Sequence, residues 1–182
     1  MTQSKAARMT SLALALAAGL AAAPAAAQSP VDSAYTDLDT DSCQVLSQVE
    51  EGESIAWLCP GFRTFPLYVN AGDGRFDVDA GIDDGNFDTI AQFNAPGPRV
   101  EWRLRDLAPF AIIYRLREVA IDARGSTLFV ETIGTAGTAG CTVATVAGDV
   151  LNANQVARDL ADALAEDFRC GVDQPVVREA VR

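Results

Sequence analysis

The stretch RVEWRLRDLAPFAIIYRL, residues 99–116, decides the fold class because it contains two strand patterns joined by a short connector. Apolar side chains at positions 100, 102 and 104 alternate with charged side chains at 101, 103 and 105. This two-residue period is typical of a strand with one buried face. We predict a strand over Arg99–Arg105, a connector formed by DLAPF or part of it, and a second strand from about Phe110.

Opposed residues of such a hairpin must lie on the same face of the sheet. The register that satisfies this condition pairs Leu104 with Ile112, Trp102 with Tyr114, and Val100 with Leu116, and it sets Glu101 opposite Arg115. The outer face then carries Arg103, Arg105, Arg115 and Arg117. Guanidinium groups bind carboxylates and phosphates through paired hydrogen bonds, so these arginines form a candidate anion or partner face. The alternative is that they pair with the acids of the chain itself, such as Glu101, Glu118 and Glu131.

The segments around this hairpin predict an α+β fold, with a mainly antiparallel β-sheet and one C-terminal amphipathic helix packed on it. Short runs rich in β-branched and aromatic residues recur at 54–59, 65–69, 75–79, 127–133 and 141–147. From about Leu151 to Phe168, apolar residues recur at four-residue steps, which is the pattern of a helix with one buried side.

Four cysteines, Cys43, Cys59, Cys141 and Cys170, predict two disulfides, since an even number in an exported chain favours pairing. Three connectivities are open, and we favour Cys43–Cys59 with Cys141–Cys170 because each joins sequence neighbours. A zinc site built from the four thiolates is disfavoured by the absence of any C-x-x-C pair.

The N-terminus predicts export. Residues 1–27 combine a basic start, a short alanine-rich apolar core and an A-x-A exit, which is the pattern of a cleaved signal peptide. We expect a mobile lead-in over 28–37, a single α+β domain over 38–174 and a mobile tail over 175–182. The predicted localisation is the periplasm or the extracellular space, with no stable membrane insertion after signal cleavage.

Composition excludes several classes of chemistry. The chain has no histidine, and removal of residues 1–27 leaves 12 arginines, no lysine and 25 acids, a formal charge of −13. Catalysis that needs histidine or lysine is therefore excluded. Nucleic acid is not an expected partner, because both molecules are negatively charged. Chemistry based on carboxylates, or on hard metal ions bound by oxygen, remains open.

Two acidic segments are candidate calcium-binding sites, although neither matches the full pattern of a calcium loop. Asp37, Asp39 and Asp41 occupy the first three ligand positions of a calcium loop, but Ser42 stands at the glycine position and Gln48 at the final acid. The second segment, residues 70–88, holds six aspartates among glycines without matching a calcium-loop pattern. We favour a solvated loop there over a weak cation site, since runs of one charge are usually solvated.

The segments YTDLDTDSC, WLCPGF, VEWRLRDLAPFAIIYRL and NANQVARDLADALAEDFRC together resemble a group of small secreted bacterial proteins of unassigned function. The resemblance implies an exported bacterial domain and adds no site residue. We therefore predict an exported, soluble, non-catalytic envelope or secreted protein that binds an unidentified protein partner or small ligand, and that needs no cofactor. The alternatives are a small carboxylate-dependent hydrolase and a weak calcium-binding protein.

Overall fold

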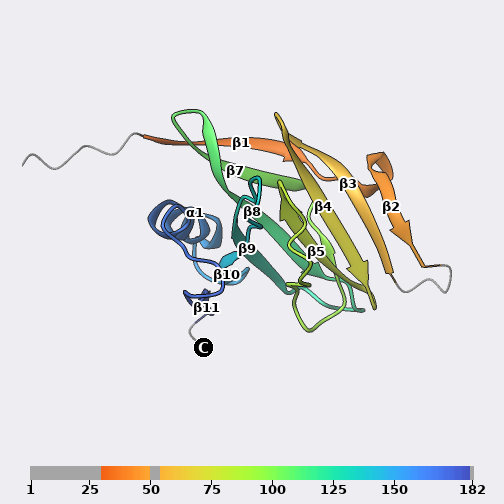
Figure 1. Ribbon diagram of the computed structural model, residues 1–182. Coiled ribbons are helices and arrows are strands. Elements are labelled where there is room, and N and C mark those ends of the chain that lie inside the picture. The colour runs from red at the N-terminus through yellow and green to blue at the C-terminus, as the bar shows by residue number, and fades with distance from the viewer. Residues whose placement is uncertain (1–29, 50–53, 181–182) are drawn as a thin grey trace, which may run out of the picture.

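A computed structural model describes residues 30–49 and 54–180, so the predicted signal peptide lies outside the described residues. Two β-sheets and one helix form three layers (Figure 1), with α1 on one side of the larger sheet and the smaller sheet on the other. The predicted α+β class, with a mainly antiparallel sheet and one C-terminal helix, is confirmed. Within the described ranges, no helix is long and apolar enough to cross a membrane.

The larger sheet has the strand order β1-β7-β8-β9-β10-β11, and β6 pairs with β8 beside β7. Its strands are β1 (Val31–Asp37), β6 (Asn94–Pro96), β7 (Arg99–Arg105), β8 (Ala108–Glu118), β9 (Ser126–Thr132), β10 (Thr142–Ala147) and β11 (Val176–Arg178). All its pairs are antiparallel except β10 with β11. The smaller sheet is an antiparallel meander of β2 (Gln44–Gln48), β3 (Ser54–Phe62), β4 (Phe65–Gly72) and β5 (Arg75–Ala80).

The β7–β8 hairpin exists, but its predicted register is wrong. Trp102 lies opposite Ile112 rather than Tyr114, and Glu101 lies opposite Ile113 rather than Arg115. The cause is the connector, which is a two-residue turn over Asp106 and Leu107, both with positive φ. This tight turn starts β8 at residue 108 and is followed by a bulge in the β7–β8 pairing.

The main core fills the space between the two sheets. Trp102 is completely buried there, and its indole N–H donates to the Thr36 hydroxyl over 2.8 Å. Its neighbours in this core are apolar side chains of both sheets, among them Leu67, Val69, Val78, Val100, Ile112, Tyr114, Leu116 and Phe129. Leu38 is also buried in this core.

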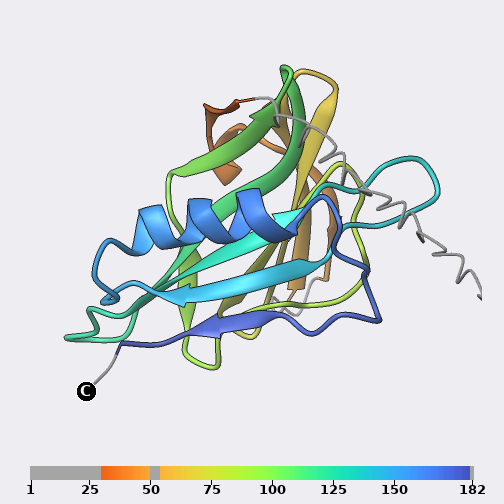
Figure 2. The same ribbon diagram turned by 90° about the vertical axis from the view of Figure 1, so that its left-hand side faces the viewer.

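The opposite face of the larger sheet is covered by α1 (Ala153–Leu164), which runs across the sheet in Figure 2. Its alanines at 153, 157 and 161 are buried in a second core that they share with strand residues such as Ile113, Val130 and Val143. Small side chains allow the helix to lie close to the strands. The face that carries the arginines is therefore a partly covered helix–sheet interface, and the prediction of an outer face is wrong for this reason.

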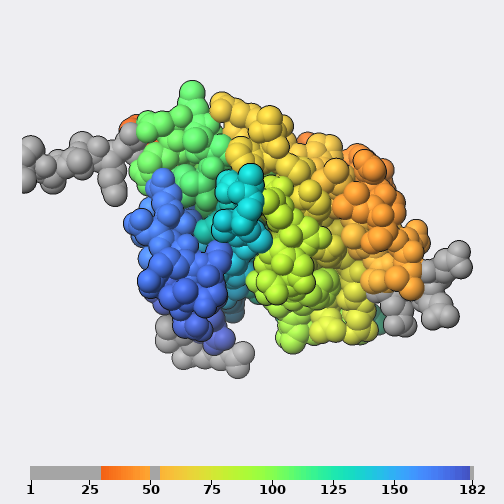
Figure 3. Space-filling view, viewed as in Figure 1, coloured from red at the N-terminus to blue at the C-terminus, as the bar shows by residue number. Residues whose placement is uncertain are grey.

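Both predicted disulfides are present, Cys43–Cys59 and Cys141–Cys170. The first joins the residue directly before β2 to β3, and the second joins the segment after α1 to the residue directly before β10. In the space-filling view (Figure 3), α1 and the strands β2 and β3 lie at opposite ends of the molecule.

The predicted bounds of the folded domain are too narrow at both ends. Residues 31–37, assigned to a mobile lead-in, form β1 and pair with β7 along its whole length. Residues 176–178, assigned to a mobile tail, form β11 beside β10. Both are edge strands held by backbone hydrogen bonds, which need little apolar side-chain pattern.

Candidate functional site

The arginine face contains two groups of side chains, one paired with acids and one turned toward a cleft. Arg103 belongs to the first group. Its Nε and Nη2 donate to the two carboxylate oxygens of Asp162 in α1 over 2.8 and 2.6 Å, and its Nη1 donates to Ser33 and Glu101. The Arg103 side chain is 7% exposed, so this is a nearly buried ion pair rather than a surface one.

The pairing repeats along the strand and the helix. Arg158 donates to both carboxylate oxygens of Glu101, and Arg105 donates to Glu166 over 2.6 Å just beyond the end of α1. Four residues of a helix span about 6 Å along its axis, and two residues of a strand span about 6.7 Å. Every fourth residue of α1 can therefore face every second residue of β7. Strand residues 101, 103 and 105 therefore meet residues 158, 162 and 166, each pair with opposite charges.

Glu101 stays ionised within this ladder of ion pairs. Its burial raises the pKa of the carboxyl, but the hydrogen bonds from Arg158 and Ser33 and the charges of Arg158 and Arg103 hold the net pKa below its usual value. Of the predicted anion-face residues, Arg103 and Arg105 thus serve helix attachment. This outcome matches the alternative in which the arginines pair with the acids of the chain.

The second group, Arg99, Arg115 and Arg117, lies at a cleft beside the N-terminal half of α1. Its volume is about 470 Å³, which suits a small molecule. Arg115 and Arg117 of β8 lie at the cleft together with Arg99 of β7 and Arg158 of α1, and the acids in its lining are Asp37 and Glu101. The cleft lining therefore carries a net charge of +2 within a chain of net charge −11.

Arg115 is held in place by neutral partners. Its Nη1 donates to the Ser126 hydroxyl over 2.6 Å, and its Nη2 donates to the Asn154 side-chain oxygen over 3.0 Å. Burial, followed by the charge of Arg117, lowers the pKa of Arg115 below its usual value. An arginine in this state is a positive charge that a bound anion would stabilise.

Arg99 and Arg117 complete the cleft. The Arg99 guanidinium lies over the Tyr35 ring, 5.7 Å from its centre, in a cation–π contact. Across residues 30–49 and 54–180, none of Arg99, Arg115 and Arg117 forms a salt bridge.

Sequence reasoning identified Arg115 and Arg117 but missed Arg99, Arg158 and Asn154. Neither of the two helix residues, Asn154 and Arg158, belongs to a predicted site. Their four-residue spacing was the available signal, because 154, 158 and 162 share one side of a helix.

The sequence-predicted calcium residues do not form a ligand shell. Asp39 caps a short 3-10 turn (η1, Thr40–Ser42), and its Oδ1 accepts the backbone N–H of Asp41. In the part of the chain that the structure describes, Asp37, Asp39 and Asp41 are not among the acids whose oxygens lie within 4.8 Å of one another.

The second acidic segment differs from its prediction. A solvated loop was expected over residues 70–88, but Asp77 and Asp79 are only 1% and 5% exposed. Burial, reinforced by neighbouring acids, raises the pKa of Asp77 to about 7 and that of Asp79 to about 8. Raised carboxyl pKa values are a property of hydrolase acids, but a substrate needs access that these two buried side chains do not offer.

Comparisons of this chain with protein-family models, curated proteins and solved structures found no match.

Proposed function

We propose that the protein is an exported binding protein whose ligand is a small anion held in the arginine cleft. The observation that carries the proposal is the trio of Arg99, Arg115 and Arg117, which have no carboxylate partner within the described residues although the chain has 25 acids. Every other arginine of β7, β8 and α1 has an acidic partner on the facing element.

Export is supported by the N-terminal pattern and by two disulfides, which form and persist in oxidising compartments such as the periplasm or the extracellular space. A strongly acidic protein repels anions in general. A local cluster of arginines therefore confines anion binding to one place.

The chemistry of the cleft selects the ligand class. Guanidinium groups offer pairs of parallel N–H donors that match the oxygens of a carboxylate or a phosphate. Asn154 and Tyr35 add polar and aromatic surface at its rim. We infer a ligand that combines at least one such group with a small organic body, since the cleft of about 470 Å³ is larger than a bare oxyanion.

The test is a titration with inorganic phosphate, sulfate and citrate at low ionic strength, monitored by calorimetry and by the melting temperature. The double variant Arg115→Gln with Arg117→Gln removes both β8 charges. Arg124→Gln is the matched control, because it removes an exposed arginine outside the cleft.

We expect the wild type and Arg124→Gln to bind at least one of the three anions, and the double variant to bind it at least tenfold more weakly. Arg99→Gln, at an exposed position, gives the same direction of change with little effect on packing. If the wild type shows no binding at 10 mM, or if the double variant binds equally well, the proposal is wrong.

A further inference from the structure

The strand β5 and the loop that follows it bring six acids together at one edge of the smaller sheet. Asp77 and Asp79 lie on the same side of β5, and Asp83, Asp84 and Asp88 follow in the loop. Glu131 comes from β9 in the larger sheet. In the space-filling view the loop and the segment after β9 lie beside each other (Figure 3), and hydrogen bonds join them from Gly134 to Ala80 and from Thr142 to Asp88.

Three of these acids are close enough to share one ion. One carboxylate oxygen each from Asp79, Asp83 and Asp84 lies within 4.8 Å of the others. Oxygens bound to a common Ca²⁺ at 2.3–2.6 Å can lie no farther apart than about twice that distance. The separation of the three acids is therefore compatible with a shared cation.

An independent observation is that the buried acids lack partners for part of their oxygens. Asp77 Oδ2 and Asp79 Oδ2 are fully buried and accept no hydrogen bond in the described residues. A buried carboxylate oxygen without a donor is costly, and native proteins usually satisfy such atoms by hydrogen bonds or metal ions. The Asp79 side chain is one of the three that converge.

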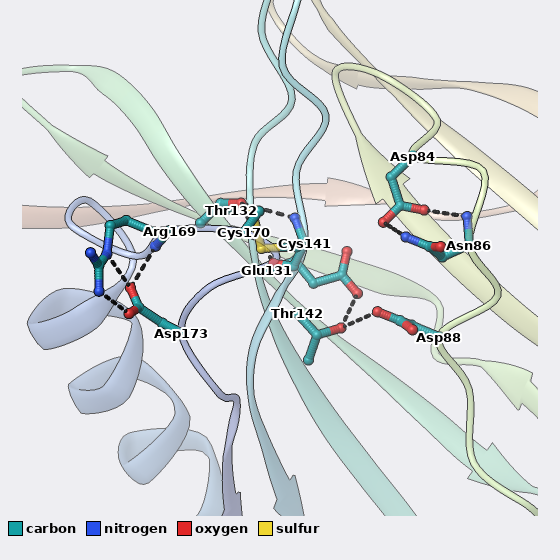
Figure 4. The surroundings of a disulfide bond; sticks show 10 residues. All are labelled: Asp84, Asn86, Asp88, Glu131, Thr132, Cys141, Thr142, Arg169, Cys170 and Asp173. Carbon is teal, nitrogen blue, oxygen red and sulfur yellow. Dashed lines mark hydrogen bonds and ion pairs between the residues drawn. A yellow bond between two sulfur atoms is a disulfide. The ribbon is translucent and has the colours of Figure 1, made fainter.

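Among the residues that the structure describes, no arginine forms a salt bridge with an acid of this cluster. Burial is the main cause that raises the pKa values of Asp77, Asp79 and Glu131, and the nearby charges that raise them further are other acids of the same cluster. Glu131 has its own hydrogen bonds, since its Oε1 accepts from the Tyr114 hydroxyl over 2.7 Å and from Thr142. Figure 4 shows Glu131, Thr142 and Asp88 close together, with Asp84 on the neighbouring loop.

The local loop structure holds the acids in place. Asp83 accepts the backbone N–H of Gly85, and Asp84 accepts both the backbone and the side-chain N–H of Asn86. The start of the loop is fixed by the hydrogen bond from Gly81 N to Pro66 O, and its later part by Thr89, whose hydroxyl donates to Phe76 O.

We propose that Asp79, Asp83 and Asp84, with Asp77 beside them, bind a hard divalent cation, Ca²⁺, where β5 passes into its following loop. The donors are all carboxylate oxygens, which suit Ca²⁺ rather than a metal that prefers nitrogen or sulfur. Mg²⁺ fits less well, because it requires a nearly ideal octahedral shell. The site is separate from the arginine cleft, so the two proposals stand or fall independently.

The test uses the purified protein with both disulfides formed, first treated with EDTA and then titrated with CaCl₂ or MgCl₂ at pH 7.5. Calorimetry gives the affinity, and the melting temperature reports the coupling to folding. Asp79→Asn keeps the size of the side chain but removes its charge. Asp41→Asn is the control, because it removes an exposed acid from the stretch with the calcium-loop spacing.

For the wild type and Asp41→Asn we expect one Ca²⁺ to bind, with a rise of about 5–10 °C in melting temperature when Ca²⁺ is a hundredfold above Kd. Mg²⁺ gives a smaller rise. In Asp79→Asn the calcium response is lost, whereas the metal-free melting temperature is equal to or higher than that of the wild type, because the cost of burying a carboxyl group among other acids is gone.

Two results for Asp79→Asn distinguish a lost metal site from misfolding: the calcium response disappears, and the metal-free melting temperature does not fall. A variant that merely failed to fold would lose metal-free stability as well; in that event Asp83→Asn, in the loop, repeats the measurement. The proposal is overturned if the wild type shows neither heat nor a thermal shift at 10 mM CaCl₂. It is equally overturned if the folded Asp79 or Asp83 variant responds to calcium like the wild type, or if Asp41→Asn alone abolishes the response.

Discussion

In the metal-free protein, the free energy of unfolding is expected to fall as the pH rises from 5 to 6. Burial and the nearby acids Asp84, Asp88 and Asp83 raise the pKa of Asp77 from 3.8 to about 7. Burial and the nearby acids Asp77, Asp84 and Asp83 raise the pKa of Asp79 to about 8. The pKa of Glu131 is raised in the same direction. In this pH window Asp77 and Asp79 are protonated in the folded chain and ionised in the unfolded chain. Stability from such groups is complete below the unfolded pKa of 3.8 and is lost as the pH approaches the folded values.

The magnitude follows from the number of protons. The folded state binds about two more protons than the unfolded state between pH 5 and 6, from Asp77 and Asp79 alone. Each proton changes the free energy of unfolding by about 1.4 kcal/mol per pH unit, so the expected loss is about 2–3 kcal/mol. The pKa values of Glu101 and Asp173 are lowered in the folded protein, so these groups lose their contribution to stability only at more acidic pH. They therefore do not oppose the loss of stability between pH 5 and 6.

The assay is urea denaturation at pH 5.0, 5.5 and 6.0 with EDTA present, followed by tryptophan fluorescence. Asp79→Asn removes one of these protons and is expected to make the slope shallower by about 1.4 kcal/mol per pH unit. A free energy of unfolding that stays constant or rises from pH 5 to 6 would refute the reasoning, because it would mean that these carboxyls are ionised when the protein folds.

Three further predictions concern stability. Replacing Cys141 and Cys170 together by serine is expected to lower the free energy of unfolding by about 3 kcal/mol, because the bond joins positions 29 apart in the sequence and so restricts the unfolded chain; urea denaturation measures this loss. Ala157→Leu places a larger side chain in the fully buried helix–sheet contact, and the same assay should show a loss of about 1–3 kcal/mol. Arg103→Leu should cost about 3 kcal/mol because Asp162 loses its partner, and adding Asp162→Leu should recover part of this loss; equal losses in the single and double variants would contradict the ion-pair interpretation.

The fold was predictable where side-chain patterns determine structure. The alternation over β7, the helical spacing before Cys170 and the even number of cysteines each depend on which side chains are buried or paired, and the structure confirms the elements and both disulfides. The predicted register of the β7–β8 hairpin was wrong because the turn residues Asp106 and Leu107 adopt positive φ without the glycine or asparagine that marks such a turn. The strands β1 and β11 were not predicted because edge strands form through backbone groups that every residue carries.

The candidate sites were less predictable, because they depend on contacts between distant segments. Asp77 and Asp79 belong to a stretch that has the composition of a solvated loop. They are buried because β5 lies against the larger sheet, where both acids lie near Tyr114 of β8 and Glu131 of β9. Likewise Arg115 and Arg103 look equivalent in the sequence. Only the position of α1 gives one of them an acid and the other a neutral amide.

The ladder of ion pairs between β7 and the region of α1 also specifies the direction in which the helix lies on the sheet. With the chain running in the observed direction, Arg158 meets Glu101 and Glu166 meets Arg105. If α1 lay on the sheet in the reverse direction, Arg158 would approach Arg105 and Glu166 would approach Glu101, so both ends would bring like charges together. The alanine-rich surface of α1 has little shape of its own with which to distinguish the two orientations. Electrostatic repulsion against the reversed helix would therefore make the observed orientation unique, a role comparable to the charged residues that set partner orientation in coiled coils.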